Sequence, residues 1–484
     1  MTAAFAVAAL ALPVSAVALP DNNTIEFSNC MLALPGTTRT ASAQCGFFEV
    51  PENPDNPEGR KISLHVAYAK ATTPTVEPDP VFIFAGGPGQ AASETWVMLR
   101  GMLDKVRKNR DIVMIDQRGT GQSNKLQCES EETDELNAEI NLELLSQLTK
   151  ECAEALDGDT RFYTTTDGMR DYDAVRQAMG YEKINLLGIS YGTRSAQVYL
   201  RMFPGSVRSL VLDSVIPMQL ALGQEHAPML DRAVSAVFDD CRADTSCNEL
   251  FSSNETDLQS LLDDLRAQPR NITIINPTSG KPQEIALSAD TLAVAIRFLS
   301  YSSESQAVLP LLVHEAVTTG NLSRLASQAI LVMSGLNEML ARGMELSVMC
   351  AEDYPFMNFE ADQSNTIIGN IFLDFVESQC AVWPSGTAPE GFHDPVISDV
   401  PVLLVSGERD PVTPPHYAAR VAETFSNSLS LVAKGQSHSV LRNMCLREIA
   451  TEFIKAGSVT ELDTTCVEKI QSSPFFTSLL GPNP

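Results

Sequence analysis

The chain has 484 residues, of which 44% are hydrophobic, and it carries a formal net charge of −27 at neutral pH. This length exceeds one hydrophobic core of ordinary size, so we expect one large domain with a substantial insertion, or two domains. The strong negative charge argues against nucleic acid as a partner, because phosphates would be repelled. No segment after the N-terminus is long and apolar enough to span a bilayer, so stable membrane insertion is not expected.

Residues 1–18 have the composition of a secretory signal peptide. They contain no charged side chain and are rich in Ala, Val and Leu, and small residues at their end predict cleavage after Ala16 or Ala18. An uncleaved anchor is the alternative, because no Lys or Arg precedes the apolar stretch. A signal peptide would place the protein in the periplasm or outside the cell.

The ten cysteines all follow the expected cleavage site, which agrees with export to an oxidising compartment. None belongs to a Cys-x-x-Cys pair, so the sequence indicates neither a zinc site nor a redox motif, and we expect no metal or other cofactor. The simplest arrangement joins cysteines that are neighbours in the sequence. It predicts the disulfides Cys30–Cys45, Cys128–Cys152, Cys241–Cys247, Cys350–Cys380 and Cys445–Cys466.

Short apolar runs that alternate with helical segments predict a mostly parallel, doubly wound α/β sheet. Such runs lack polar residues because helices cover both faces of the sheet. The expected strands are residues 46–50, 61–70, 80–85, 111–116, 184–187, 208–213, 401–406 and 428–432, and the helices among them include 167–179 and 193–200.

The pattern becomes helical between residues 213 and 401. The expected helices there are residues 229–238, 256–267, 288–299, 307–318 and 321–340, with Ser288 as the N-cap of the third. They predict a helical cap over residues 214–395 that covers the carboxyl ends of the strands. Residues 19–213 and 396–484 would form the core.

The segment Gly188-Ile189-Ser190-Tyr191-Gly192 lies between an expected strand and an expected helix. Strand, Gly-x-Ser-x-Gly and helix in this order form the nucleophile elbow of the α/β-hydrolase fold. Glycines flank the serine because side chains would clash in so tight a turn. The sequence therefore predicts an α/β-hydrolase with Ser190 as its nucleophile.

A serine nucleophile needs a base, and the base needs an orienting acid, which follow the serine in the order acid, then histidine. Asp410 and His438 lie in polar loops after the last two expected strands, at the same sheet edge as Ser190. His438 is the one histidine of six in a loop after the last strand, so we expect it to be the base and Asp410 the acid. Glu408 and Asp213 are the rival acids.

An oxyanion intermediate needs two backbone N–H donors. One should be the amide of Tyr191, at the start of the elbow helix. The other should come from the glycine-rich loop after the strand at 80–85. Pro88 has no N–H, so Gly87 is the first choice and Gly86 the second.

Four motifs together resemble the exported branch of the proline iminopeptidase and tripeptidyl aminopeptidase serine exopeptidases. They are Gly-Gly-Pro-Gly at 86–89, Asp-Gln-Arg-Gly-Thr-Gly-Gln-Ser at 116–123, Gly-Ile-Ser-Tyr-Gly-Thr at 188–193, and Asp-Pro-Val-Thr-Pro at 410–414 with Ser-His at 437–438. The resemblance runs from about Cys45 to Cys466 and includes the C-terminal segment from His438 onwards. By itself, the turn at 116–123 is expected to brace the active-site loops.

This resemblance implies an enzyme that removes single residues or short peptides from substrates with a free N-terminus. Such an enzyme must hold the α-ammonium group of the substrate, and a carboxylate suits that task. Cys350-Ala351-Glu352-Asp353-Tyr354 resembles a cap segment where the family carries such an acid, which points to Glu352. The alternative for Glu352 is one more acid on an acidic surface.

Two other functions fit parts of this pattern. An exported carboxylesterase would use the same triad but would not depend on a free amine. A non-catalytic binding protein of the hydrolase fold would typically have lost a triad member, whereas this chain keeps all three. The sequence leaves the oligomeric state open.

Overall fold

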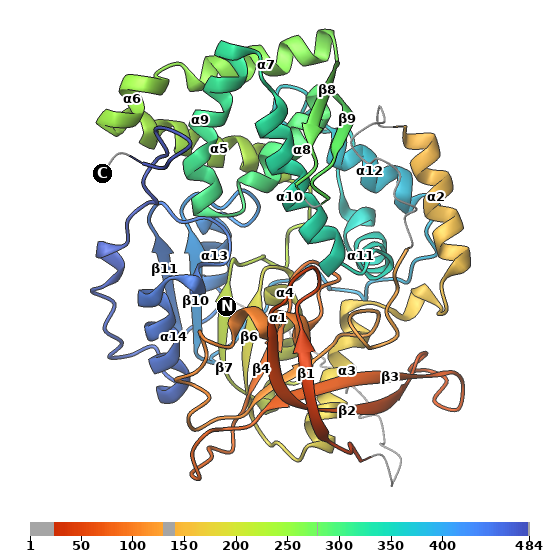
Figure 1. Ribbon diagram of the computed structural model, residues 1–484. Helices are drawn as coiled ribbons and strands as arrows, with labels where there is room; N and C mark the ends of the chain where they lie inside the picture. Colours follow the sequence, from red (N-terminus) through yellow and green to blue (C-terminus); the bar gives the residue numbers. More distant parts are fainter. Residues whose placement is uncertain (1–23, 129–140, 278, 483–484) are drawn as a thin grey trace, which may run out of the picture.

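A nine-stranded sheet forms the centre of the computed structural model, which describes residues 24–128, 141–277 and 279–482. Its strands are β1 (Ser28–Ala33), β2 (Thr40–Pro51), β3 (Lys61–Ala69), β4 (Val81–Phe84), β5 (Ile112–Ile115), β6 (Ile184–Ile189), β7 (Val207–Asp213), β10 (Val402–Gly407) and β11 (Ser428–Ala433). They lie in the order β1-β2-β3-β5-β4-β6-β7-β10-β11 (Figure 1). The pairings from β1 to β5 are antiparallel, and those from β5 to β11 are parallel. The expected signal peptide lies outside the described residues.

The sheet buries side chains on both of its faces. Phe82 and Phe84 of β4 belong to one hydrophobic cluster, whereas Val81 and Ile83 belong to another, because successive residues of a strand point to opposite faces. Helices α3 (Thr165–Ala178), α4 (Tyr191–Met202) and α13 (Pro415–Ala422) cover the first face, and α1 (Ala92–Leu99) and α14 (Met444–Ala456) cover the second. The doubly wound α/β-hydrolase sheet is therefore confirmed.

A layer of helices joins β7 to β10 and lies at one end of the strands (Figure 1). Its elements are α5 (His226–Ala243), α6 (Thr245–Phe251), α7 (Asn254–Ala267), the hairpin β8 (Arg270–Ile275) and β9 (Pro282–Leu287), α8 (Ala289–Leu299), α9 (Ser303–Thr319) and α10 (Ser323–Met339). They have a hydrophobic cluster of their own, which includes Leu265, Leu292 and Leu309. Ser288 caps α8 as expected, since its side chain accepts a hydrogen bond from the amide of Thr291 at 3.1 Å.

Residues 341–396 complete the connection to β10 but pack differently. Helix α11 (Arg342–Val348), the π-helical turn Met349–Asp353 and α12 (Ile371–Cys380) place side chains in the cluster that covers the first face of the sheet. Trp383 belongs to the same cluster. The division of the chain into a core and a cap at residues 214–395 stays a prediction. Within the described ranges, no helix has both the length and the apolar character needed to cross a bilayer.

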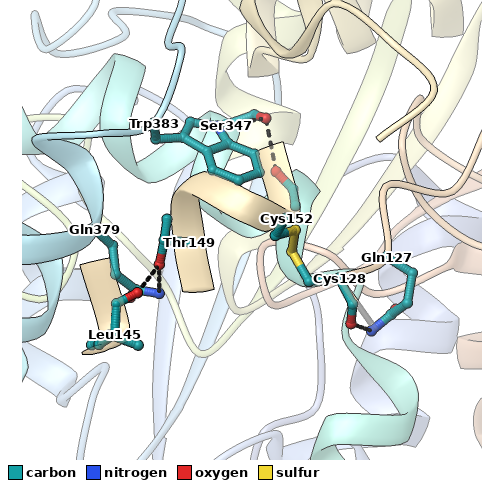
Figure 2. Close-up of a disulfide and its surroundings, with 9 residues drawn as sticks. Gln127, Cys128, Leu145, Thr149, Cys152, Ser347, Gln379 and Trp383 are labelled. Carbon is teal, nitrogen blue, oxygen red and sulfur yellow. Dashed lines mark hydrogen bonds between the residues drawn. A yellow bond between two sulfur atoms is a disulfide. The ribbon is translucent and has the colours of Figure 1, made fainter. Parts of the chain in front are cut away.

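All five predicted disulfides are present. They are Cys30–Cys45, Cys128–Cys152, Cys241–Cys247, Cys350–Cys380 and Cys445–Cys466. Figure 2 shows Cys128–Cys152, which ties helix α2 (Leu142–Ala155) to the preceding loop. Nearby, Gln379 of α12 donates a hydrogen bond to Thr149 of α2 at 3.2 Å, so α2 is also attached to the connection before β10.

Candidate active site

Ser190 lies in a strained turn between β6 and α4. Its backbone has φ 55° and ψ −124°, a left-handed conformation that costs free energy for a residue other than glycine. A Cβ on Gly188 would lie 2.5 Å from the carbonyl oxygen of Gly192, and one on Gly192 would lie 2.0 Å from that of Phe84. Both flanking positions therefore require glycine, as the tight-turn interpretation of the motif predicts.

The structure brings Asp410 and His438 together. Nδ1 of His438 lies 2.8 Å from Oδ2 of Asp410, which is fully buried. The other oxygen, Oδ1, accepts hydrogen bonds from the amides of Val412 at 2.9 Å and Thr413 at 2.8 Å. These contacts fix the carboxylate, and the carboxylate fixes one nitrogen of the imidazole.

Burial and charge act against each other in this pair. Burial raises the pKa of Asp410, but His438 and the hydrogen bonds from Thr413 outweigh it, so the pKa lies below its ordinary value. Burial lowers the pKa of His438, but the charge and hydrogen bond of Asp410 outweigh it, so that pKa lies above its ordinary value. Asp410 is therefore ionised and stabilises a protonated imidazole.

Thr413 is a member of this site that the sequence analysis did not identify. Its hydroxyl donates to Oδ2 of Asp410 at 2.6 Å and lies 3.2 Å from Nδ1 of His438. The hydroxyl thus holds the carboxylate oxygen that faces the imidazole. The available signal was its position three residues after the acid, where a hydroxyl side chain can bond back to that acid.

The two rival acids are occupied elsewhere. Oδ1 and Oδ2 of Asp213 accept hydrogen bonds from the amides of Val440 at 2.9 Å and Leu441 at 3.0 Å. Burial raises the pKa of Asp213 to about 6, although these two amides oppose the shift. Glu408 accepts a hydrogen bond from the amide of Gly435 at 2.7 Å. Neither replaces Asp410 as the partner of Nδ1.

Asp213 also connects the nucleophile to the histidine loop. Its carbonyl oxygen accepts a hydrogen bond from the amide of Ser190 at 2.9 Å, while its carboxylate holds the residues after His438. The amide of Ser439 donates to the hydroxyl of Ser214 at 2.8 Å. Among the hydrogen bonds of the described residues, none joins Oγ of Ser190 to the His438 ring. The elbow and the histidine loop are thus anchored to the same strand end, and direct contact remains a prediction.

The glycine-rich loop after β4 lies against the nucleophile. A Cβ on Gly86 would lie 3.2 Å from Cβ of Ser190, so the backbone passes close to the elbow. Gly87 has φ 107°, and a Cβ there would lie 2.7 Å from the amide nitrogen of Gly89. This position therefore requires glycine. The oxyanion roles of Gly87 and Tyr191 stay predictions.

Glu352 is fully buried, not placed on an acidic surface. Its Oε1 accepts a hydrogen bond from the amide of Thr165 at 2.6 Å, and its Oε2 lies 2.6 Å from the Thr165 hydroxyl. That hydroxyl also lies 2.6 Å from the phenol oxygen of Tyr191, the residue after the nucleophile. Burial raises the pKa of Glu352 to about 8, which favours the neutral form of the side chain.

The neighbouring Asp353 forms a buried ion pair that the sequence analysis did not identify. Nη1 of Arg194, on the elbow helix, lies 2.7 Å from Oδ1 of Asp353, and both side chains are fully buried. Oδ1 also accepts a hydrogen bond from the amide of Leu222 at 2.7 Å. Oδ2 is buried and has no hydrogen-bond partner among the described residues. An unpaired buried acceptor beside Glu352 is suited to an incoming donor.

The turn at residues 116–123 is hydrogen-bonded to neighbouring elements, as expected for a turn that braces the loops. Asp116 accepts hydrogen bonds from the amide of Ser93 at 2.9 Å and lies 2.9 Å from Nδ1 of His65. Arg118 does not pair with Asp116, but binds Asp171 through two hydrogen bonds of 2.7 Å. The described residues contain no cluster of three or more His, Cys, Asp or Glu that could hold a metal ion.

Comparison with known proteins places this geometry in a family. A family model described as the alpha/beta hydrolase fold matches residues 79–441. "Putative hydrolase YuaR" of Escherichia coli is 24% identical and covers 91% of this chain and 92% of its own length. "Serine protease Hip1" of Mycobacterium tuberculosis is 24% identical and covers 91% of both chains. "Tripeptidyl aminopeptidase" of Streptomyces coelicolor is 23% identical and covers 89% of this chain and 84% of its own.

These matches confirm the resemblance to tripeptidyl aminopeptidase-type serine exopeptidases that the motifs indicated. The family model begins before β4, includes the elbow, and extends beyond His438 to Leu441. It therefore spans most of the chain, together with the sheet and the loops that hold Ser190, Asp410 and His438. The chain belongs to the α/β-hydrolase family.

Proposed function

We propose that this protein is a serine exopeptidase that releases single residues or short peptides from substrates with a free N-terminus. The observation that carries the proposal is the 2.8 Å hydrogen bond between His438 and buried Asp410, on loops anchored beside the strained elbow of Ser190. Relatives named serine protease and tripeptidyl aminopeptidase support peptides as substrates, although their identity to this chain is only 23–24%.

The proposed reaction is acyl transfer in two steps. His438 takes the proton of the Ser190 hydroxyl as the oxygen bonds to the scissile carbonyl carbon, and the amides of Tyr191 and Gly87 stabilise the oxyanion. His438 then passes that proton to the leaving amine, the C–N bond breaks, and an acyl-enzyme remains. Water releases the acyl group by the same route, and Asp410 keeps the imidazole in the required tautomer.

We further propose that the acidic turn at Glu352 and Asp353 holds the α-ammonium group of the substrate. Oδ2 of Asp353 has no hydrogen-bond partner within the described part of the chain, and a nearby cation would favour the ionised form of Glu352. An ion pair with the ammonium group anchors the substrate and measures how many residues precede the scissile bond. Glu352 is the residue that the resemblance indicates for this role.

A comparison of free and acetylated N-termini tests the proposal. We expect hydrolysis of a tripeptide arylamide with a free amine and a loss of about 100-fold or more in kcat/KM when the amine is acetylated, because a buried carboxylate loses its charged partner. Equal rates on both substrates, together with faster hydrolysis of simple esters, would instead support the exported carboxylesterase.

Export also belongs to this proposal. The five disulfides are typical of proteins that fold in an oxidising compartment, in agreement with a secreted or periplasmic location. Mass spectrometry of the mature N-terminus tests it. A protein that begins after Ala16 or Ala18 would support cleavage of the signal peptide, and one that retains residues 1–18 would support the uncleaved anchor.

A further inference from the structure

Arg297 of α8 carries a positive charge and forms no ion pair with an acidic side chain of the described residues. Its Nη2 donates a hydrogen bond to the phenol oxygen of Tyr301 at 3.2 Å, and its Nη1 is buried without a hydrogen-bond partner among the described residues. The guanidinium carbon lies 5.9 Å from the ring centre of Tyr301 and 5.4 Å from that of Phe372. The half-buried charge thus lies against two aromatic rings, and one of its nitrogens has no hydrogen-bond partner among the described residues.

A shortage of carboxylates does not explain the lack of an acidic partner for Arg297. Acidic residues outnumber basic ones by 61 to 34, so carboxylates are not scarce. Two fully buried arginines have such a partner, since Arg118 pairs with Asp171 and Arg194 pairs with Asp353. Arg297 is half-buried, as is Arg232, whose guanidinium bonds to backbone carbonyls. A buried donor without an acceptor costs free energy, which a ligand with the matching group would recover.

Arg297 lies close to the proposed base. The ring of Tyr301 meets the ring of His438 edge to face, with 5.2 Å between the ring centres. On the other side, Phe372 packs at 4.7 Å from the ring of His226, whose Nδ1 is also buried without a partner among the described residues. We call His226, Arg297, Tyr301 and Phe372 the Arg297 cluster.

The charge of this cluster comes from Arg297 alone. Burial lowers the pKa of His226 well below its ordinary value, and the nearby charges of Arg297 and His438 lower it further. His226 is therefore neutral at physiological pH. The cluster thus combines one fixed positive charge, apolar ring faces and two polar atoms without a partner in the described ranges, beside the loop of the proposed base.

We propose that Arg297 binds the C-terminal carboxylate of the leaving part of a short peptide substrate. This inference rests on the proposed exopeptidase function. His438 must protonate the leaving amine, so the leaving group lies beside the imidazole, where Tyr301 packs. The guanidinium and a carboxylate match in shape, because two parallel N–H groups face two oxygens.

The distances limit the length of the leaving group. The guanidinium and the His438 ring both lie beside the Tyr301 ring, with centre distances of 5.9 Å and 5.2 Å. An extended chain covers about 3.3–3.6 Å per residue, so the carboxylate can reach Arg297 when the leaving part has about one or two residues. The substrate class is therefore a short oligopeptide with both termini free.

The test compares one peptide with a free C-terminal carboxylate and the same peptide as a C-terminal amide. Its amino terminus stays free, and the leaving part has one or two residues. For the unmodified protein we expect kcat/KM to be about 10- to 100-fold higher for the free carboxylate, mainly through a lower KM, because the amide cannot pair with the guanidinium. Equal kcat/KM values for the two peptides would overturn the inference.

The variant Arg297→Gln should reduce this preference to about one, and Arg297→Lys should keep part of it, since the charge remains but the planar fork is lost. The matched control is Arg266→Gln, an exposed arginine of α7, and it should keep the full preference. Preference retained in Arg297→Gln would contradict the assignment. Should that variant not fold, the comparison of the two peptides with the unmodified protein and Arg297→Lys still decides.

A peptide arylamide with a free N-terminus separates the two proposals, because it has no C-terminal carboxylate. If the unmodified protein does not hydrolyse it or either peptide, the proposed exopeptidase function is wrong. If the protein hydrolyses it but does not distinguish carboxylate from amide, only the role of Arg297 is wrong.

Discussion

The loops at the sheet edge and the Arg297 cluster differ in how fully their buried polar side chains are hydrogen-bonded. At the sheet edge, both oxygens of Asp410 and both oxygens of Asp213 accept hydrogen bonds from fixed donors. In the Arg297 cluster, Nη1 of Arg297 and Nδ1 of His226 are buried and have no partner within the described part of the chain.

We interpret this difference in hydrogen bonding as a sign of two tasks, catalysis and ligand recognition. In the proposed mechanism, the groups that hold the catalytic geometry receive all their hydrogen bonds from the protein itself, which would preorganise the imidazole before substrate arrives. The groups that we propose to recognise a ligand have polar atoms without a partner among the described residues, which the ligand would supply. Glu352 and Asp353 show both patterns, because Glu352 is bonded to Thr165 while Oδ2 of Asp353 has no partner among the residues that the structure describes.

Removal of the proposed nucleophile should give the largest effect on activity, and it tests the role of the loops at the sheet edge. We expect Ser190→Ala to lower kcat by about 10⁶-fold, as in other enzymes with this triad, without loss of the fold. Hydrolysis of a free-amine peptide arylamide measures it, and thermal unfolding checks the fold. The control is Ser426→Ala, an exposed serine, which should retain full activity. Activity retained by Ser190→Ala would refute the role of Ser190.

Loss of the acid should have the next largest effect. Asp410→Asn should lower kcat by about 10⁴-fold, because an amide favours the wrong tautomer of the imidazole. Asp410 also raises the pKa of His438 against the effect of burial, so the acid limb of the pH profile of kcat/KM should move to lower pH in this variant. The exposed Asp399→Asn is the control. A larger loss in Glu408→Gln than in Asp410→Asn would reassign the acid.

For Glu352 we expect a smaller effect, on the pH dependence of stability. Its pKa rises from 4.5 to about 8 in the folded protein, so its contribution to folding is fully present below about pH 4.5 and is lost as the pH rises through about 8. Glu352→Gln resembles the protonated side chain and should remove a decline of a few kcal/mol in the free energy of unfolding between these pH values. Urea unfolding at several pH values measures it.

The exposed Glu360→Gln, from the same segment, is the control and should keep the decline. An unchanged decline in Glu352→Gln would show that another group causes it. If Glu352 also binds the ammonium group, this variant should raise KM for free-amine peptides but not for acetylated ones.

Much of the fold could be predicted because its signals are local. The apolar runs of β4 and β5 are buried along their whole length, and the neighbour pairing of cysteines is correct throughout. Strand β1 was not predicted, because Leu32 is its one buried residue and it shows no clear alternation. The hairpin β8–β9 was not predicted either, since it lies among helices and pairs only with itself.

In the candidate site, too, some contacts could be predicted from the sequence and others could not. The elbow and the pairing of Asp410 with His438 follow from motif and chain order, because the fold brings parallel strand ends to one edge. The contacts of Glu352 with Thr165 and of Arg194 with Asp353 join residues 187 and 159 positions apart. Such pairs leave no local pattern in the chain. That Nη1 of Arg297 has no hydrogen-bond partner among the described residues depends on which side chains pack around it, and the sequence does not show this packing.

Covalent labelling tests the central claim most directly. A fluorophosphonate reacts with a serine only where a base activates the hydroxyl and N–H donors stabilise the phosphoryl oxygen. Peptide mapping by mass spectrometry should find one modified residue, Ser190, and the label should be strongly reduced in His438→Ala. A label on another serine, or an unmodified Ser190 in the folded protein, would contradict the account.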